Sequence, residues 1–512
     1  MTKKRITLAT LGCGMIGAGA LTLLADDQST EAVQMPTYPA SCDTSTLPNG
    51  YVYPDITSTM PYDRHSLETG TKTDAKVADD CGVFETQKQF DLFSWATFVA
   101  LNWPADDQGN PKGDSISAHP DAPRVWETYL SPTQIFKADG STPDAWGTPE
   151  HKHEDGKPKR VLLATSKKTH RPHVLDEVNE AFFNNETPLP PIVDLNKEYV
   201  RYEIRINKAE YEYILSNKLY NQEGQANFLK VVGNQISFPS GQSGATPQFG
   251  AMELKVAWKK LTDDEVTSKK FYTIKPEVYH PYSKKYTHGH HYGLVGMHIM
   301  VRTKDASEWV WATFEHVDNA PRVDLRGNGT RKVDYDPSKE YNFWSQDKGK
   351  ASIAGFSDAS YAAMLKAQKT NEAAGKPAAD YSQEKADRIP SQITQVITSN
   401  NDVIDSTWTN SLNAEMQKKL KGTVWENYRL ISTQWPVDSG TGRAGNPAPI
   451  SLGNPVMETY MQVNGSCMNC HAGATFGPLN SDGVQTNMAN FSFMLQRAHK
   501  SSTSTTKNDS NE

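Results

Sequence analysis

The chain has 512 residues and a formal net charge of −7, with 37% hydrophobic and 10% aromatic residues. This length is enough for about two to four domains, or for one large body with an appendage. The negative charge argues against nucleic acid as a partner and against a polybasic membrane-binding face. The 11 Trp, 21 Tyr and 30 Pro favour a β-rich body with many loops over a helical bundle.

The first residues have the pattern of an export signal. Three basic residues at positions 3–5 precede an uncharged, mostly apolar run over 6–25, and Asp26 and Asp27 follow it. We therefore predict residues 1–25 as a signal peptide and a location in the periplasm or outside the cell. Its removal leaves 50 basic against 60 acidic residues, a net charge of −10. An uncleaved anchor is the alternative, since about 20 apolar residues can span a bilayer, and only then would the chain meet a membrane.

Composition divides the rest of the chain into four regions. Residues 26–81 are polar and rich in Pro, Thr and Asp, which predicts an extended N-terminal arm. Residues 82–450 form the main body, and residues 451–500 form a separate C-terminal segment. Residues 501–512 are rich in Ser, Thr and Asn, which predicts a disordered tail.

Hydrophobic periodicity predicts helices and strands within the body. Residues 84–101 are predicted as a helix that ends before Pro104. Strands are predicted at 252–258, 293–302 and 308–317, and helices at 359–373 and 411–420. The last two strands flank a short polar connection, which predicts a hairpin. The pattern is that of an α+β fold with an antiparallel sheet, in which a large β-rich body with helices precedes the C-terminal segment.

The predicted hairpin brings polar residues to one face. Alternation places His298 on one face of strand 293–302. If the turn is centred between residues 305 and 306, His298 lies opposite Thr313, with Glu315 nearby on the same face.

Further polar residues on these strands are candidates for a catalytic site. His316 follows Glu315, and Glu253 and Lys255 share one face of strand 252–258. Such residues could line a polar pocket or be satisfied residues of a half-exposed sheet, and both readings stay open. The candidate catalytic residues are His298, Glu315, His316, Glu253 and Lys255.

The strongest motif is Cys467-Met468-Asn469-Cys470-His471. Cys-x-x-Cys-His is the attachment signal of c-type haem: both thiols bond to the porphyrin and the histidine binds the iron. A thioredoxin-like pair should open a helix after a strand, which residues 463–466 do not suggest, and a zinc site would need a second ligand pair nearby. We therefore predict one covalent haem c on Cys467 and Cys470, with His471 as the proximal iron ligand.

The haem segment, residues 451–500, is shorter than an ordinary small cytochrome c. Residues 454–463 and 491–499 are predicted as its leading and trailing helices, which gives a minimal α-helical, cytochrome c-like unit. A unit of this size cannot enclose a haem alone, so we expect the body to supply part of the pocket.

The sixth ligand of the iron stays open. Met488 is the tentative candidate, because a thioether so close to the motif would raise the reduction potential. Met494, a histidine of the body or an open site are the alternatives. Both methionines could also be ordinary core residues, since Met commonly fills gaps.

The cysteine count leaves one further pair. Of the five cysteines, Cys13 lies in the leader and two belong to the haem motif. In an oxidising compartment the remaining Cys42 and Cys81 are expected to form a disulfide that ties the arm to the body, with two separate thiols as the alternative.

Several short stretches resemble secreted bacterial mono-haem proteins of the cytochrome c family. They are residues 92–95, 102–104, 125–129, 253–258, 311–319 and 457–460. The resemblance implies haem binding, a metal-ion centre and electron transfer, but no settled substrate. Only Cys467, Cys470 and His471 carry over as functional residues.

Two classes of function follow. The first is an exported mono-haem cytochrome that exchanges single electrons with a periplasmic redox protein or a respiratory complex. The second is a haem enzyme of peroxidase or oxygenase type, with an open distal site between the haem segment and the body.

Overall fold

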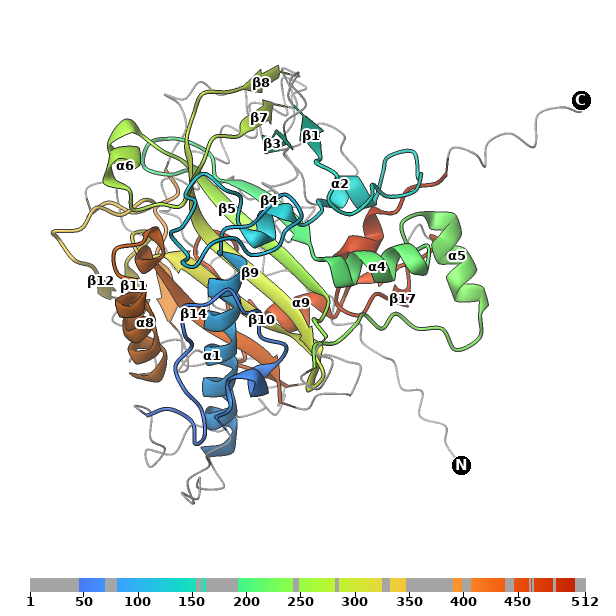
Figure 1. The fold of residues 1–512 in the computed structure, drawn as a ribbon, viewed down its shortest axis with the longest axis horizontal. Helices are drawn as coiled ribbons and strands as arrows, with labels where there is room; N and C mark the ends of the chain where they lie inside the picture. Colours follow the sequence, from blue (N-terminus) through green and yellow to red (C-terminus); the bar gives the residue numbers. More distant parts are fainter. Residues whose placement is uncertain are drawn as a thin grey trace, which may run out of the picture.

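The computed structural model describes residues 46–69, 81–152, 158–159, 161–162, 192–242, 248–280, 285–324, 332–346, 390–397, 407–437, 446–459, 462, 465–481 and 485–501. These residues form a mixed α+β fold around one large antiparallel sheet, as the sequence predicted (Figure 1). Residues 1–25, the predicted helix 359–373 and nearly all of the predicted tail lie outside the described residues.

The large sheet has the strand order β15-β14-β10-β9-β5-β4, and β6 also pairs with β9. Its strands are β4 (Arg201–Ile206), β5 (Met252–Lys260), β6 (Thr273–Ile274), β9 (Tyr292–Thr303), β10 (Ala306–His316), β14 (Tyr428–Pro436) and β15 (Pro447–Ala448). The predicted strands 252–258, 293–302 and 308–317 correspond to β5, β9 and β10. The sequence reading missed β4 and β14. The six residues of β4 alternate between charged and apolar side chains, so its signal was present and was overlooked, whereas β14 has no clear alternation.

The register of the β9–β10 hairpin is the predicted one, although its turn is not. His298 pairs with Thr313, as predicted. The turn lies earlier, because Ala306 pairs with Thr303, and the register then shifts between Ala306 and Val310. Within this shift Trp309 has a φ of +68°, a left-handed conformation that bulky residues rarely adopt. This irregularity therefore restores the register in which His298 lies opposite Thr313.

Helix α1 (Gly82–Leu101) covers one face of the sheet. Phe98 stacks on Phe314 with ring centroids 4.2 Å apart, and the Trp95 ring meets Phe314 edge-on at 5.1 Å. Helix α8 (Thr407–Lys419) packs against the same face beside β14. The helices predicted at 84–101 and 411–420 are both confirmed.

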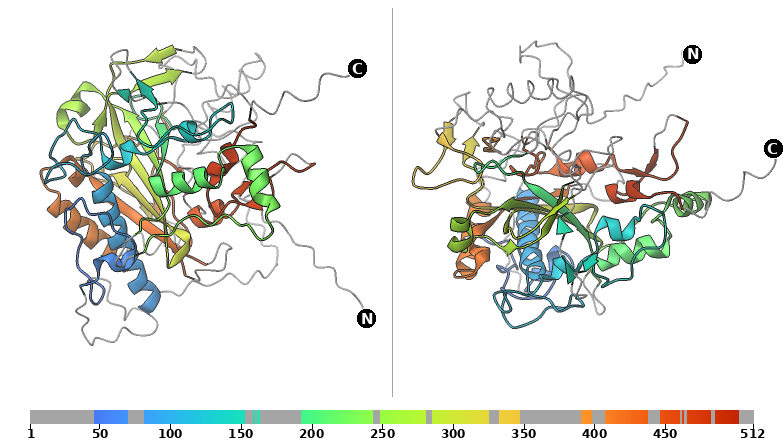
Figure 2. Two further views of the ribbon diagram at one scale, coloured as in Figure 1. Left: turned by 45° about the vertical axis from the view of Figure 1, so that its right-hand side comes forward. Right: turned by 90° about the horizontal axis from the view of Figure 1, so that it is seen from above.

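The C-terminal segment covers the opposite face (Figure 2, right). It contains α9 (Cys467–His471), β16 (Thr475–Phe476), β17 (Asn487–Met488) and the 3-10 helix η8 (Phe493–Arg497). Its described residues are less helical than predicted. Residues 454–459 of the predicted leading helix form turns, because the side chains of Asn454 and Glu458 bond to nearby backbone nitrogens and compete with helical bonding. The predicted trailing helix is reduced to η8.

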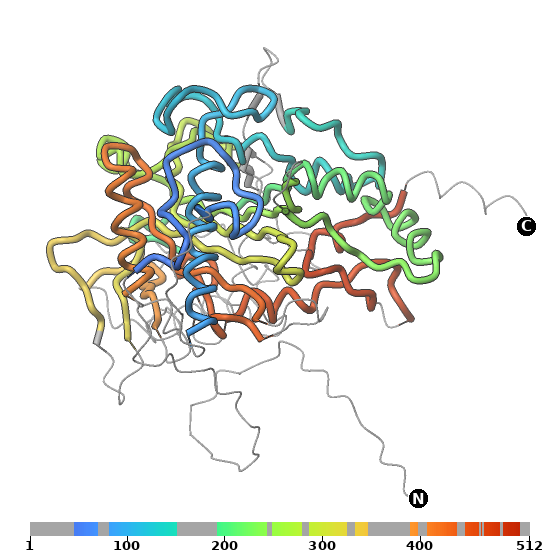
Figure 3. The backbone as a smooth tube through the Cα atoms, turned by 60° about the horizontal axis from the view of Figure 1, so that its bottom comes forward, coloured from blue at the N-terminus to red at the C-terminus, as the bar shows by residue number. Residues whose placement is uncertain are grey.

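The segment also lies beside helix α5 (Gln222–Lys230), as the tube in Figure 3 shows. The backbone nitrogen of Gln222 donates to the carbonyl of His499 at 3.0 Å, and the Gln225 side chain donates to the carbonyl of Leu495 at 2.8 Å. The last described part of the chain is therefore fastened to the body rather than attached only through α9.

The remaining elements are short. They are η1 (Arg64–Leu67), η3 (Val125–Thr128), α2 (Pro132–Ile135), β1 (His151–Lys152), β2 (Pro158–Lys159), β3 (Val161–Leu162), α4 (Lys208–Ser216), α6 (Asp263–Ser268), β7 (Glu277–His280), β8 (Lys285–Thr287), β11 (Arg322–Asp324), β12 (Lys332–Asp334), β13 (Gln395–Ile397) and η7 (Val424–Asn427). Within the described residues, no helix combines the length and hydrophobicity that crossing a bilayer requires.

The described part of the N-terminal arm, residues 46–69, is irregular apart from η1 and packs against the core beside α1. Cys81 is buried at the N-terminal end of α1, with 5% of its surface exposed. Cys42 lies outside the described residues, so its predicted disulfide with Cys81 stays a prediction.

Candidate functional site

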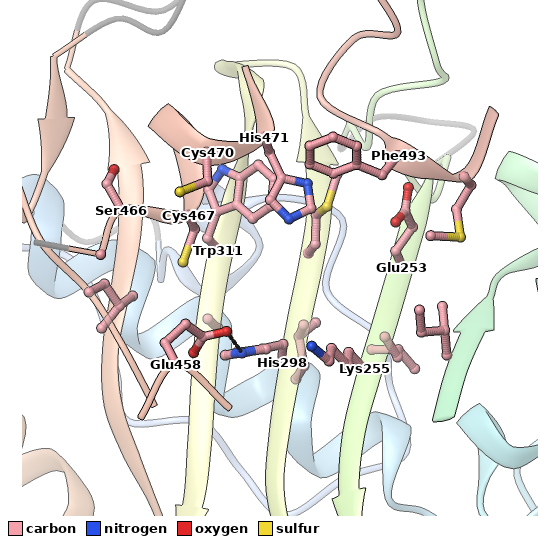
Figure 4. A pocket seen from close by; sticks show the side chains of 18 of the residues that line it. Glu253, Lys255, His298, Trp311, Glu458, Ser466, Cys467, Cys470, His471 and Phe493 are labelled. Atoms are coloured by element: carbon pink, nitrogen blue, oxygen red, sulfur yellow. Dashed lines mark hydrogen bonds and ion pairs between the residues drawn. The ribbon is translucent and has the colours of Figure 1, made fainter. Parts of the chain in front are cut away.

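A pocket of about 240 Å³ lies between the sheet and the C-terminal segment (Figure 4). The sheet contributes side chains of β5, β9 and β10, namely Glu253, Lys255, His298, Met300 and Trp311. The C-terminal segment contributes Glu458, Cys467, Cys470, His471, Phe493, Met494 and Arg497, among others. Both thiols and the histidine of the motif therefore line one pocket with three of the candidate catalytic residues.

Helix α9 gathers the residues of the motif on one side. The spacing of three and four residues places Cys467, Cys470 and His471 on neighbouring turns of the same helix face. The hydroxyl of Ser466 begins the helix by accepting from the backbone nitrogen of Asn469 at 3.3 Å. The structure thus brings together the three residues that the motif singled out.

Cys467 and Cys470 form no disulfide with each other. Burial, together with the nearby Glu458 carboxylate, holds the pKa of Cys467 well above its usual value. A dithiol used for disulfide exchange needs the opposite shift, towards the thiolate. The environment of Cys467 therefore argues against a thioredoxin-like role.

The imidazole of His471 is fixed by one hydrogen bond and two aromatic contacts. Its Nδ1 lies 2.8 Å from the carbonyl oxygen of Phe491. A carbonyl can only accept, so Nδ1 carries the proton and the lone pair is left on Nε2. The rings of Trp311 and Phe493 lie 4.5 Å and 5.0 Å from the imidazole, centroid to centroid. The carbonyl of Phe491 and the two rings therefore hold the imidazole in one tautomer and one orientation.

The carbonyl of Phe491 is itself held in position. Asn490 and Phe491 have φ angles of +50° and +70°, so the chain turns sharply there. The indole nitrogen of Trp309 donates to the carbonyl of Asn490 at 2.9 Å, which fastens the turn to β10. The irregular part of β10 therefore supports the residue that orients His471.

The side of the pocket that faces α9 is built from cross-strand rows of the sheet. Lys255, His298 and Thr313 form one row across β5, β9 and β10. Glu253, Met300 and Trp311 form the next row along the same strands. Because these rows share one face, their side chains converge below the motif.

His298 is paired with a carboxylate. Its Nε2 donates to Oε1 of Glu458 at 3.0 Å, and Oε2 of Glu458 accepts from the backbone nitrogen of Asn454 at 2.9 Å. Burial alone would raise the pKa of Glu458, but the charge and hydrogen bond of His298 and the charge of Lys255 hold it below its usual value. The carboxylate is therefore ionised at neutral pH. Figure 4 shows this pair across the pocket from His471.

Glu253 stands in a different environment. It lines the pocket from β5 and contacts Glu210 of α4 in the interior. Burial raises the pKa of Glu253 to about 7, and burial together with the charge of Glu253 raises the pKa of Glu210 well above its usual value. The pocket thus has one ionised carboxylate and one carboxyl pair that favours the protonated form.

Two of the candidate catalytic residues lie away from the pocket. Glu315 is fully buried and accepts from the guanidinium of Arg429 at 2.7 Å. His316 donates from Nε2 to the carbonyl of Lys270 at 3.1 Å and stacks on Phe271 at 4.1 Å. Burial lowers the pKa of His316 to about 4, so it is neutral at neutral pH. Both residues stabilise the body and do not contact the pocket.

The geometry also argues against Met488 as an iron ligand. Met488 lies on β17, where it pairs with Thr475, and 55% of its surface is exposed. It does not line the pocket, whereas Met494, with 5% exposed, does. The prediction rested only on the short separation of Met488 from the motif, and the hairpin of β16 and β17 turns this side chain outward.

Sequence reasoning missed Trp311, Glu458, Gln434 and Arg497 as residues that build the site. Trp311 could have been predicted, because alternation places it on the same face of β10 as Thr313. Glu458 and Arg497 had no local signal, because their contacts with the pocket depend on how the segment crosses the sheet. Within the described residues, no group of three or more His, Cys, Asp or Glu is placed to hold a metal ion.

Comparison of the chain with protein-family models, with curated proteins and with solved structures finds no match. The resemblance to mono-haem cytochrome c family proteins therefore stays an expectation, and a functional conclusion depends on the pocket itself.

Proposed function

We propose that this chain is an exported mono-haem c-type cytochrome that exchanges single electrons with a periplasmic redox protein or respiratory complex. In this proposal Cys467 and Cys470 bond covalently to the porphyrin, and Nε2 of His471 binds the iron. The observation that carries it is the 2.8 Å hydrogen bond from Nδ1 of His471 to the carbonyl of Phe491, which orients the imidazole and places the proton on Nδ1 in a pocket shared with both thiols.

The chemistry of the pocket fits such a group. Its walls combine apolar and aromatic side chains with two cations, Lys255 and Arg497, whose charge suits the propionate carboxylates of a haem. Its volume of about 240 Å³ is just below the range of about 300–1,000 Å³ that encloses a drug-sized ligand. A porphyrin would therefore be only partly enclosed and would keep one edge near the surface, which suits electron exchange with a partner.

The bound group would gain and lose the electron, and the surrounding residues of the chain would set its reduction potential. The carbonyl of Phe491 holds the imidazole of His471 in one tautomer and orientation. Trp311 and Phe493 flank the imidazole and exclude water, which lowers the local dielectric constant. The ionised Glu458 opposite favours the more positively charged state of the pocket.

The test is export of the full chain in a host that attaches c-type haem. We expect a coloured protein whose mass includes one haem and whose porphyrin resists acid-acetone extraction. Cys467→Ser and Cys470→Ser should each lose one covalent bond, and the double variant should release its porphyrin. Met488→Ala, which changes an exposed residue outside the pocket, is the matched control. A colourless protein, or a porphyrin that is extracted from the unmodified chain, would contradict the proposal.

One observation favours the second candidate, a haem enzyme. His298 and Glu458 form an oriented imidazole–carboxylate pair across the pocket from His471, with Lys255 beside it. Such a pair can accept a proton from a small molecule bound in the pocket, since Glu458 stabilises the imidazolium. Adding cyanide, carbon monoxide or peroxide separates the two candidates. An unchanged visible spectrum supports the electron carrier, and a shift that His298→Ala alters supports the enzyme.

A further inference from the structure

Two buried carboxyl groups meet at the wall of the pocket, and the proposed function does not yet use them. Glu253 comes from β5 with 6% of its surface exposed, and Glu210 comes from the first turn of α4 with none exposed. Oε1 of Glu253 and both carboxyl oxygens of Glu210 are buried without a geometrically suitable donor among the described residues. Neither carboxyl group forms a close ion pair in the described part of the chain. A buried pair of this kind needs an explanation.

A shared proton is the simplest explanation. Two carboxylates in contact in a low-dielectric interior cannot both be ionised, because each pays a desolvation cost and repels the other. Burial is the largest cause of the raised pKa of each group, and the value for Glu253 is about 7. Glu253 therefore gains or loses a proton near neutral pH, while Glu458 across the pocket stays ionised.

Few other charges act on the pair. The Arg497 guanidinium of η8 lowers the pKa of Glu253, and the Ser492 hydroxyl lowers the pKa of both carboxyl groups. The other charged or titratable groups that line the pocket are Lys255, His298, Glu458, Cys467, Cys470 and His471. The described strand neighbours of Glu253 in β4 and β9 are Ile206 and Met300, which are neutral. A change of charge inside the pocket is therefore weakly screened at the pair.

The pair is also placed to respond to such a change. Glu253 lies in the row that continues through Met300 to Trp311, and the Trp311 ring is 4.5 Å from that of His471. Figure 4 shows Glu253 on the same side of the pocket as Phe493, near the motif.

We propose that Glu253 and Glu210 form the proton-binding site of this pocket, which takes up one proton from solvent when the pocket gains an electron and releases it when the electron leaves. The electron comes from the redox partner, the proton comes from water, and no bond to the carboxyl oxygens other than O–H forms or breaks. This inference deepens the proposed function and rests on it. It adds that electron exchange with the partner is coupled to proton exchange with the surroundings.

The test is the midpoint potential of the haem-loaded full chain, measured between pH 5 and pH 9. We expect the potential to fall as pH rises through neutrality. Full coupling of one proton to one electron changes the equilibrium tenfold per pH unit, which corresponds to about 59 mV. Glu253→Gln and Glu210→Gln should each flatten this dependence. Glu212→Gln is the matched control, because Glu212 is an exposed residue of the same helix that pairs with Lys208.

The outcomes separate the two proposals. A chain without covalent haem contradicts the proposed function and this inference together. A haem-loaded chain whose potential does not vary with pH contradicts this inference alone, as does a pH dependence that both glutamine variants retain. If one variant fails to fold, the other still decides, because each removes one member of the pair. The infrared band of a protonated carboxyl group gives a second readout, and we expect Glu210→Gln to weaken it at pH 7 because Glu210 is the more strongly protonated member of the pair.

Discussion

Oε1 of Gln434 accepts from the backbone nitrogen of Met468 at 2.9 Å and from the Ser466 hydroxyl at 3.2 Å, so strand β14 holds the start of the helix that carries both thiols. The same side chain donates to the carbonyl of Pro449 at 2.6 Å. The Gln434 amide therefore connects β14 to Pro449, where the segment before the motif begins, and to Ser466 and Met468, where the motif starts.

Gln434→Leu should destabilise the fold and loosen the motif. The change leaves buried polar groups at Met468, Ser466 and Pro449 without their partner, at a cost of about 1–3 kcal/mol for each unsatisfied group. We expect a lower free energy of unfolding in denaturant titrations and a smaller fraction of chains that carry covalent haem by mass. Gln108→Leu, at an exposed position, is the control and should change stability by less than about 0.5 kcal/mol. Equal stability of the two variants would show that Gln434 does not fasten α9.

Gly296→Ala should disturb the same interface from the sheet side. A Cβ at Gly296 would lie 2.8 Å from Cγ2 of Val456 and 3.1 Å from Cε of Met457, closer than packed carbons tolerate. Overpacking of this kind costs about 1–3 kcal/mol. Gly82→Ala is the control, because a Cβ there meets nothing within 4 Å at the start of α1. Thermal unfolding of both variants measures the difference, and equal melting temperatures would contradict close seating of the segment on β9.

His316 should make the fold sensitive to mild acid. Burial lowers its pKa to about 4, from an ordinary value of 6.5. The unfolded chain therefore binds the proton first as pH falls, and stability is lost between about pH 6.5 and pH 4, by about 3 kcal/mol in all. Denaturant titrations over this range measure the loss. His316→Gln should flatten the slope, whereas His288→Gln, at an exposed position, should keep it.

Asp91 should have the opposite effect over an overlapping range. It is fully buried in α1, and burial raises its pKa from 3.8 to about 7 despite hydrogen bonds from Gln87 and Thr433. The folded chain keeps this proton longer than the unfolded chain, so stability is lost as pH rises from about 4 to about 7, by about 4 kcal/mol. Asp91→Asn should remove that loss, with the exposed Asp55→Asn as control. A variant that unfolds with the same pH slope as the original chain would show that Asp91 titrates normally.

Met488→Ala should leave the visible spectrum and the stability of the haem-loaded chain unchanged. The side chain is more than half exposed on β17 and lies outside the pocket. Absorption spectra of the oxidised and reduced forms check this expectation. Conversion to a high-spin spectrum would instead restore Met488 as the sixth ligand.

The sequence predicted those parts of the fold that depend on local patterns. Alternation along residues 252–258 and 293–302 predicted the strands. The predicted pairing of His298 with Thr313 was confirmed, but an unpredicted irregularity in β10 produces it and the predicted turn does not. The sequence could not predict the partner of His298, because Glu458 lies 160 residues away on a turn whose position depends on the whole segment. Over the described residues 454–459 the predicted leading helix was wrong, because the side chains of Asn454 and Glu458 bond to the backbone instead. The face of the sheet on which a strand residue lies could therefore be predicted from the sequence, whereas contacts between distant segments could not.

The irregularity between Ala306 and Val310 has a consequence for how this hairpin tolerates change. It lies between the turn and the rows that line the pocket, so it absorbs a mismatch in length before that mismatch reaches His298. A one-residue insertion or deletion at the tip, residues 304–305, can be accommodated there. A one-residue insertion beyond Val310 would instead turn every following side chain of β10 to the other face of the sheet. The tip of the hairpin is therefore free to diversify, and the strand beyond it is not.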